Sequence, residues 1–412
     1  MNSVSRLQGA FSHVRRLAAG MLLACGGMAG AHAADVYVTA EFKPDLNDPN
    51  QREFVNTTPW TGVCAAGHKP TCIANDWWSI DTTIRGVKHA VRQADWGPNG
   101  FYIRIPGPRT VTVTSDDGAS SFDLDLRIIG SAMRVTDADR DGEAWGFVSG
   151  GGSRDCDNGI RGYSEYTDMR MLLSRNGGES SVACSLHWMN TNNYRIDALD
   201  FVYALRTPSP LGMRSGVYTG ATTYTYGATG EGTDFDLGHG AELTDRSVTV
   251  HFRLEVRHAF QLALAPGSDR AILAPRGGWS QWSDHGIAPE RLERDVPFSI
   301  SSTGTFSVST QCQYTQPDGR CAIRNITDTA EDVPLDVTLT LPGFKVIGSD
   351  QAALDVPLVP GGHPPLFGAD SVIIGRPSRL RFAVNGAAVG SLLAHPGSRY
   401  QGEVTVVFDA DP

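Results

Sequence analysis

The sequence predicts an all-β protein made of two tandem β-sandwiches. Charged residues are only 19% of the 412 residues, whereas glycine and proline are abundant, at 46 and 23 copies. Apolar and polar residues alternate in many short segments, and turn residues separate these segments roughly every ten residues. Short strands joined by turns produce this pattern, as they do in sandwich folds.

The clearest predicted strand covers residues 248–256, VTVHFRLEV, in which every second residue is apolar. One face of this strand would meet a core, and the polar residues between would face away from it. The same alternation predicts strands at 109–114, 122–129, 195–205, 260–265, 298–308, 333–341, 379–384 and 404–408. The only stretch that favours a helix is 82–94.

The first residues have the composition of a secretory signal peptide. Arg15 and Arg16 precede an apolar stretch that ends in the cleavage motif AHA, residues 31–33. We therefore expect residues 1–33 to be removed during secretion. The alternative is lipidation at Cys25, because LLAC resembles a lipobox. The apolar stretch is short and interrupted by glycine, which argues against a membrane anchor, and no later segment is long and apolar enough to span a bilayer.

Cysteines behind this signal form local pairs. The chain has seven cysteines, and the even number left after Cys25 indicates disulfides in an oxidising compartment. A metal site is the alternative, but it would need CxxC spacing or adjacent histidines, and neither occurs. Sequence alone leaves the connectivity open, and we expect nearest-neighbour bonds: Cys64 with Cys72, Cys156 with Cys184, and Cys312 with Cys321.

Charge and motifs argue against several functions. The net charge of −10 makes nucleic acid an improbable partner. The sequence has no GxSxG elbow, no HExxH and no phosphate loop, so we expect neither an enzyme nor a cofactor. Two carboxylates that meet in space, as in a glycosidase, are an alternative that a sequence leaves open.

One acidic stretch resembles the start of a calcium loop. Asp137, Asp139 and Asp141 alternate and are followed by glycine, which suits that ion. Position twelve is Val148, where an EF-hand needs a bidentate glutamate. We interpret the stretch as a solvated turn, with a calcium site of another kind as the alternative.

Two tryptophan pairs are candidates for sugar stacking or interface contacts. Adjacent strand residues face opposite ways, so at most one of Trp77 and Trp78 would be exposed. We expect them to pack in a core. Trp279 and Trp282 are also expected to be structural.

A short sequence repeat suggests that the two sandwiches differ in their last strands. Residues 215–221 are SGVYTGA and residues 397–403 are GSRYQGE, so both contain Tyr-x-Gly before a strand. The first copy is followed by one strand, a Gly/Asp-rich loop and the strand 248–256. The second is followed by one strand, 404–408. We therefore expect the second sandwich to lack its last strand, which leaves a groove that another chain's strand could fill.

In the order of these elements, the sequence resembles the minor tip adhesins of chaperone–usher fimbriae of the colonisation-factor-antigen and cable-pilus type. The resemblance covers most of the chain behind the signal. It rests on the two cysteine pairs of the first half, TPSPLGMRSGVYTG, the strand 248–256 and the ending RLRFAVNGAAVGSLLAHPGSRYQGEVTVVF. The ending also resembles that of major pilins of this type.

This resemblance implies an N-terminal adhesin domain, residues 34–257, and a C-terminal pilin domain, residues 258–412, both Ig-like. The pilin domain would lack its last Ig strand. A periplasmic chaperone would cover the groove, and the N-terminal segment of the next subunit would replace it at the outer-membrane usher. The implied location is the fimbrial tip at the cell surface, reached through the periplasm. The residues implied at the groove are Tyr400, Gly402, Val404, Val406 and Phe408.

A tip subunit needs no donor segment of its own. The segment ADVYVTAEF, residues 34–42, could serve as a donor, but we expect it to be the first strand of the adhesin domain. Enteric members of the family bind sugars through an arginine cluster. The matching stretch here, ATTYTYGATG, has no arginine, so no receptor residues are carried over. The receptor would be a glycan or a protein.

Two other functions compete with an adhesin. One is a non-adhesive initiator of pilus assembly. The other is a self-sufficient secreted β-sandwich, either a carbohydrate-binding module or a hydrolase, whose second domain would be complete.

Overall fold

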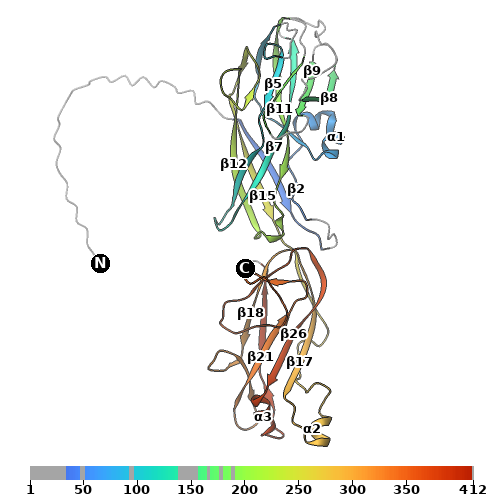
Figure 1. Cartoon of the computed structure of the whole chain (residues 1–412), viewed down its shortest axis with the longest axis vertical. Coiled ribbons are helices and arrows are strands. Elements are labelled where there is room, and N and C mark those ends of the chain that lie inside the picture. The colour runs from blue at the N-terminus through green and yellow to red at the C-terminus, as the bar shows by residue number, and fades with distance from the viewer. Residues whose placement is uncertain are drawn as a thin grey trace, which may run out of the picture. The chain divides into compact units, whose positions relative to one another are not determined.

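The computed structural model describes residues 34–46, 52–91, 97–137, 156–164, 168–175, 180–186 and 191–410. Almost all regular structure in them is β-strand (Figure 1), which confirms the all-β prediction. The residues of the expected signal peptide and lipobox lie outside the described ranges. None of the described helices is long and apolar enough to cross a membrane.

The strands from β1 to β15, here called the first sandwich, hydrogen-bond into one curled sheet system. Its strands are β1 (Ala34–Phe42), β2 (Val55–Asn56), β3 (Trp78–Asp81), β4 (Gly86–Ala90), β5 (Phe101–Ile105), β6 (Arg109–Ser115), β7 (Ser121–Asp137), β8 (Cys156–Ser164), β9 (Asp168–Arg175), β10 (Val182–Leu186), β11 (Asn192–Arg206), β12 (Gly216–Gly227), β13 (Phe235–Asp236), β14 (Ala241–Leu243) and β15 (Ser247–Val256). Short helical turns are η1 (Cys64–His68), α1 (Lys69–Ala74) and η2 (Pro210–Gly212).

Alternation along these strands builds one continuous core. In β15 the inward residues are buried and the residues between them are half-buried or exposed. Long paired strands such as β7 and β11 carry this core along their length. Fully buried tyrosines fill much of it, among them Tyr194, Tyr203 and Tyr224. Burial of this much apolar surface is the main term that stabilises the sandwich.

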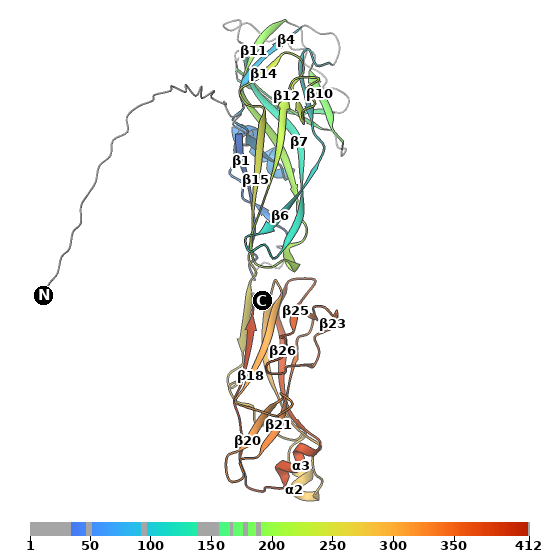
Figure 2. The same ribbon diagram turned by 90° about the vertical axis from the view of Figure 1, so that its left-hand side faces the viewer.

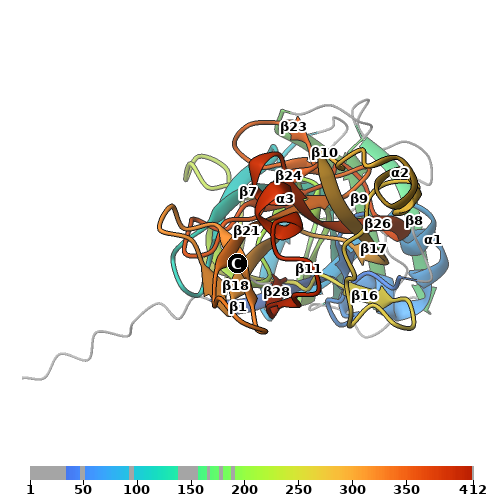
Figure 3. The ribbon, with the colours of Figure 1, turned by 90° about the horizontal axis from the view of Figure 1, so that it is seen from below.

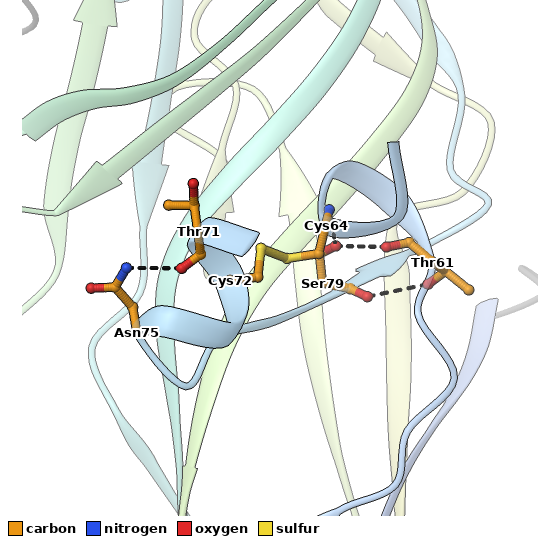
Figure 4. Close-up of a disulfide and its surroundings, with 6 residues drawn as sticks. All are labelled: Thr61, Cys64, Thr71, Cys72, Asn75 and Ser79. Carbon is orange, nitrogen blue, oxygen red and sulfur yellow. Dashed lines mark hydrogen bonds between the residues drawn. A yellow bond between two sulfur atoms is a disulfide. The ribbon is translucent and has the colours of Figure 1, made fainter. Parts of the chain in front are cut away.

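The first disulfide fixes the helical turns to the flank of this sandwich. Cys64 is bonded to Cys72, and the Cys64 amide donates to Ser79 Oγ at 2.8 Å. Ser79 Oγ in turn donates to the Thr61 carbonyl at 2.6 Å, and Thr61 Oγ1 donates back to the Ser79 carbonyl at 3.2 Å (Figure 4). The turn is therefore tied to β3 as well as closed on itself.

The strands from β16 to β28, several of which are labelled in Figure 2, are here called the second sandwich. They form two sheets, one of eight and one of five strands. They are β16 (Phe260–Leu264), β17 (Arg291–Ser302), β18 (Phe306–Cys312), β19 (Tyr314–Thr315), β20 (Cys321–Asn325), β21 (Asp332–Thr340), β22 (Lys345–Val346), β23 (Gln351–Ala352), β24 (Val356–Pro357), β25 (Leu366–Gly368), β26 (Ile373–Asn385), β27 (Tyr400–Gln401) and β28 (Val404–Asp409). The helices are α2 (Ser280–His285) and α3 (Ala387–Leu393).

The larger sheet has the order β16-β17-β26-β21-β20-β19, with β24 and β27 at its margins, and the smaller has the order β23-β22-β25-β18-β28. Their inward residues form a second core that includes Phe298, Phe306 and Phe367. The strand β16 is an edge strand of the larger sheet, and β28 is an edge strand of the smaller sheet.

Two sequence-based expectations are wrong. Residues 82–94 hold no helix in their described part, because β4 lies there, paired with β11 and β14. Its alternating burial outweighs its weak helical preference. The predicted strand 298–308 is two strands, since the chain crosses from one sheet to the other at residues 303–305. Thr303 fixes this crossing, where its Oγ1 accepts the Ala259 amide at 2.8 Å.

Candidate functional site

The candidate site is the sheet edge formed by β28. This strand pairs antiparallel with β18 along its whole length, from Ser307–Asp409 to Cys312–Val404. Within the described residues, β18 is its one strand partner. The other side of β28 therefore presents backbone groups that no described strand pairs, and such an edge is a template for a further strand.

A second edge lies beside it. The strand β16 pairs with β17 from Phe260–Ser302 to Leu264–Phe298 and with no other described strand. The ring centroid of Phe260, the first residue of β16, lies 6.3 Å from the ring centroid of Phe408 in β28. The edges β16 and β28 thus lie next to each other (Figure 3) and belong to different sheets. Between them the two sheets are not joined by a described strand.

In the first sandwich a strand fills the equivalent place. There β15 pairs antiparallel with β12, from Gly216–Val256 to Thr225–Ser247, and parallel with β1, from Ala34–Val248 to Phe42–Val256. The inward residues of β15 are at most 2% exposed. They are Val248, Val250, Phe252, Leu254 and Val256.

In the second sandwich, the two strands that border the corresponding place, β28 and β16, have partly uncovered apolar rows. Every second residue of β28 is apolar and half-buried, although its face points to the core. On β16, Phe260 and Leu262 are half-buried and Leu264 is 66% exposed. By contrast, inward residues of the adjoining β17 and β18, such as Ile300 and Val308, are 0% exposed. These partly uncovered rows border the gap between β16 and β28, which we call the acceptor groove.

The residues expected at the groove fall into two places. Val404, Val406 and Phe408 line it from β28. Tyr400 instead belongs to β27, which pairs with β20 of the larger sheet, and burial raises the pKa of its hydroxyl. Gly402 lies between these strands, where a Cβ would be 2.9 Å from the Ala322 carbonyl oxygen. Tyr400 and Gly402 thus direct the chain from one sheet to the other.

The wall on β16 was missed by sequence analysis. Phe260, Leu262 and Leu264 alternate within the predicted strand 260–265, so the pattern was visible. Nothing in it distinguishes a groove wall from an ordinary core face, because the difference is whether a neighbouring strand covers it.

A disulfide joins the two sheets at one end of the groove. Cys312 ends β18 opposite Val404, and Cys321 begins β20 in the larger sheet; the two are bonded. The turn between them contains Gly319 at φ 85°. The remaining bond, between Cys156 and Cys184, joins β8 to β10 in the first sandwich.

The other sequence candidates lie away from this edge or outside the described residues. Asp137 ends β7, and Asp139 and Asp141 lie outside the described residues. Among the residues that are described, no group of three or more His, Cys, Asp or Glu side chains could hold a metal ion. Trp77 packs against a small cluster around the first disulfide, and Trp78 packs against the main core. Trp279 and Trp282 are 42% and 39% exposed, and the expectation that they are structural stays a prediction.

The groove's chemistry suits a peptide strand. Its walls on β16 and β28 carry no basic residue, and the acidic Glu403 and Asp409 flank the apolar row of β28. Free backbone groups along an edge can hydrogen-bond any extended chain, and the half-buried row can take alternate apolar side chains from it.

Comparison with known proteins gives only distant likenesses. No protein-family model matches the chain, and the comparison with curated proteins gave no match. A solved chaperone–tip adhesin complex of CFA/I fimbriae has 10% identity and a TM-score of 0.25, covering 92% of this chain and 96% of that one. CfaE, the adhesive subunit of CFA/I fimbria of enterotoxigenic Escherichia coli, has 9% identity and a TM-score of 0.24, with 92% of each chain covered.

The CsuC–CsuE chaperone–tip subunit complex of Acinetobacter baumannii Csu pili has 10% identity and a TM-score of 0.21, covering 92% of this chain and 98% of that one. Likenesses this distant carry no functional argument, so the function proposed below rests on the strand pairing.

Proposed function

We propose that this protein is the tip adhesin of a fimbria assembled by strand donation. Its second sandwich accepts a strand from another chain, and its first sandwich attaches the fibre to a host or surface receptor. The observation that supports this is the acceptor groove: β28 has one described strand partner and a half-buried apolar row. Exposed apolar strips of this kind are costly unless a partner covers them.

The first sandwich supports a tip position. Residues 34–42, the possible donor segment, form β1 and pair with β15 of their own chain over nine residue pairs. That strand is therefore not free to fill another subunit's groove. The first sandwich is itself complete at the place where the second is open.

The proposal includes the partners that such assembly needs. A periplasmic chaperone occupies the groove after secretion, and the donor subunit replaces it at an outer-membrane usher. The protein then lies at the cell surface, at the fibre tip, and works without catalysis. A glycan or protein is its receptor, and nucleic acid is not a partner.

Peptide binding tests the acceptor function. Residues 34–412, with disulfides formed, are mixed with a synthetic peptide SVTVHFRLEV, the sequence of β15, and examined by native mass spectrometry. We expect a one-to-one complex that forms slowly and resists dilution. A protein that binds neither this peptide nor other alternating peptides, and that unfolds as a stable monomer, would contradict the proposal.

Receptor binding separates an adhesin from a non-adhesive initiator. The protein is first saturated with the peptide, so that its groove is occupied and cannot itself bind cells or glycans. It is then applied to host cells and to a glycan array. Saturable binding supports the adhesin, whereas none with an intact acceptor function supports the initiator.

A further inference from the structure

The connection between β16 and β17 carries four large apolar residues that are exposed. Trp279 is 42% exposed and Trp282 is 39% exposed, both on or beside α2. Two isoleucines in the same connection, Ile272 and Ile287, are 77% and 58% exposed. We call these four residues the tryptophan surface. Tryptophan is over-represented among the residues that dominate binding energy at protein interfaces.

This surface is held in a defined shape. The Trp282 amide donates to the Trp279 carbonyl at 3.0 Å, and the Gly286 amide donates to the Trp282 carbonyl at 3.0 Å. Gly286 ends the helix at φ 66°, a left-handed conformation that glycine adopts at little cost. Arg276 Nε donates to Glu293 Oε1 at 3.1 Å, which ties the connection to β17. The exposed rings are therefore on an ordered projection.

The projection continues one edge of the acceptor groove. After β16 ends, Ala274 forms a bridge to Glu293 of β17, so the chain returns to the sheet edge. Trp279 follows five residues later in the sequence. Ser302, which pairs with Phe260, is nine residues from Glu293, or about 30 Å along a strand. A donated strand of about a dozen residues covers that distance.

The first sandwich supplies the direction of such a strand. Because β15 is antiparallel to β12 and parallel to β1, a strand filling the groove runs antiparallel to β28 and parallel to β16. It therefore begins near Phe260 and ends at the level of α2. In Figures 1 and 2, α2 and α3 lie at that same end of the second sandwich.

The two ends of the second sandwich differ in what the chain attaches to them. The Phe260 end follows β15 after only three residues, so the chain's own first sandwich is attached there. A strand donor whose folded part follows its donated segment would emerge beside α2. We propose that the tryptophan surface docks the folded body of the subunit that donates the strand. This inference rests on the proposed acceptor function.

Site-specific photo-crosslinking in assembled fibres tests the docking. Two variants of the full chain are expressed in its native host cells. In one, a benzophenone amino acid replaces Trp282; in the other, it replaces Thr405 on the outer face of β28. Ile347 is the control position; it is 49% exposed and directly follows β22, which β25 and β18 separate from β28. Fibres are sheared from the cells, which leaves periplasmic chaperone behind, and crosslinked peptides are sequenced.

We expect positions 405 and 282 to capture the same protein, through its N-terminal segment and its folded body respectively, and position 347 to capture at least tenfold less. If position 405 captures a donor while position 282 captures nothing or another protein, the docking proposal is wrong and the acceptor function stands. If position 405 captures nothing in intact fibres, both are wrong.

A double substitution separates docking from folding. Trp279→Ser with Trp282→Ser should lower the thermal midpoint of the unassembled chain only slightly, because the two residues are 42% and 39% exposed and lie outside the core cluster of the second sandwich. In a chain with the photo-crosslinker at Ile287, the same change should lower donor capture by tenfold or more, the loss expected for a tryptophan that anchors an interface. Capture at position 405 should remain. A large fall in the thermal midpoint, or unchanged capture at position 287, would overturn the proposal.

Discussion

At the scale of single residues, the repeated Tyr-x-Gly has a physical basis in its glycines. A Cβ on Gly220 would lie 2.6 Å from the Thr112 carbonyl oxygen, and one on Gly402 would lie 2.9 Å from that of Ala322. Both distances are shorter than real side chains tolerate, so each glycine allows a neighbouring strand to approach closely. In the first copy, the Tyr218 hydroxyl also donates to the Arg214 carbonyl at 2.9 Å, which holds the preceding turn.

Gly220→Ala should therefore destabilise the first sandwich by about 1–3 kcal/mol, because the methyl group forces β6 and β12 apart. The measurement is the urea midpoint of the transition in which this sandwich unfolds. Gly212→Ala is the matched control, since a Cβ there meets nothing within 4 Å. Equal effects from the two substitutions would show that close approach is not the reason for the glycine.

Lys88 is a buried cation in the first sandwich. Its side chain is 1% exposed, and Nζ donates to the backbone oxygens of Pro98, at 3.1 Å, and Leu237. Burial lowers the pKa of this amine to about 7, although the nearby Asp236 opposes the shift. The lysine thus connects β4 to two loops, at the cost of removing a charge from water.

This burial predicts a pH dependence of stability. The unfolded chain keeps the lysine protonated up to its ordinary pKa of 10.5, whereas the folded chain loses the proton near pH 7. Between these values the unfolded state binds more protons, so the contribution of Lys88 to the free energy of unfolding rises with pH. Lys88→Met should make the rise between about pH 7 and 9.5 smaller. The measurement is the free energy of unfolding by urea at about pH 7 and about pH 9.5 for wild type and Lys88→Met. The control is Lys43→Met, at an exposed lysine. Identical pH profiles for wild type and Lys88→Met would contradict the prediction.

At the scale of elements, β28 and β15 show how the same pattern can have two outcomes. Apolar and polar residues alternate in both strands. The strand β28 directly follows Tyr400-x-Gly402, and β15 comes after β12, the strand that contains Tyr218-x-Gly220. The row on β15 is covered by β1 and the opposite layer, whereas the row on β28 is left half-buried. Coverage by a neighbour, rather than the alternation itself, decides whether such a strand is core or groove.

Substitutions on the two faces of β28 should separate groove from surface. Val406→Asp puts a charge into the groove and should abolish binding of the β15 peptide, because a buried unpaired charge costs several kcal/mol. Val407→Asp, on the other face and 43% exposed, should leave binding within about twofold. The measurement is peptide titration by native mass spectrometry. Binding that both substitutions weaken equally would place the peptide elsewhere.

Strands with clear alternation were predictable because one face of each is buried. The predicted segments 109–114, 195–205 and 248–256 lie within β6, β11 and β15. Errors came where local pattern is ambiguous. In 298–308 the alternation continues through the crossing at Thr303, so one strand was expected instead of two. The short helices α2 and α3 have too few residues for a helical period to emerge.

The candidate site was predictable in part. The row on β28 followed from alternation and from what succeeds each Tyr-x-Gly copy. Its opposite wall on β16 and the exposure of Trp279 could not be predicted, because both depend on which strands meet across the sandwich. Those contacts join residues more than a hundred positions apart, as between Phe260 and Phe408.

At the scale of the whole molecule, the chain contains one closed sandwich and one open one. In the closed sandwich, β15 runs antiparallel to β12 and parallel to β1. Among the described residues, no strand lies in this way between β28 and β16 of the open sandwich. The central claim is that a strand from another chain supplies this element and thereby links the protein into a fibre.

Thermal unfolding of residues 34–412 with a donor strand fused through a flexible linker tests this claim most directly. The donor is SVTVHFRLEV, and the control donor has serine at its five inward positions. We predict that the donor raises the midpoint of the second sandwich by about 10 °C or more, because it covers the apolar row, and that the serine control leaves it unchanged. Equal midpoints with donor, control and no fusion, in a monomeric protein, would show that the second sandwich is already complete and would contradict the account.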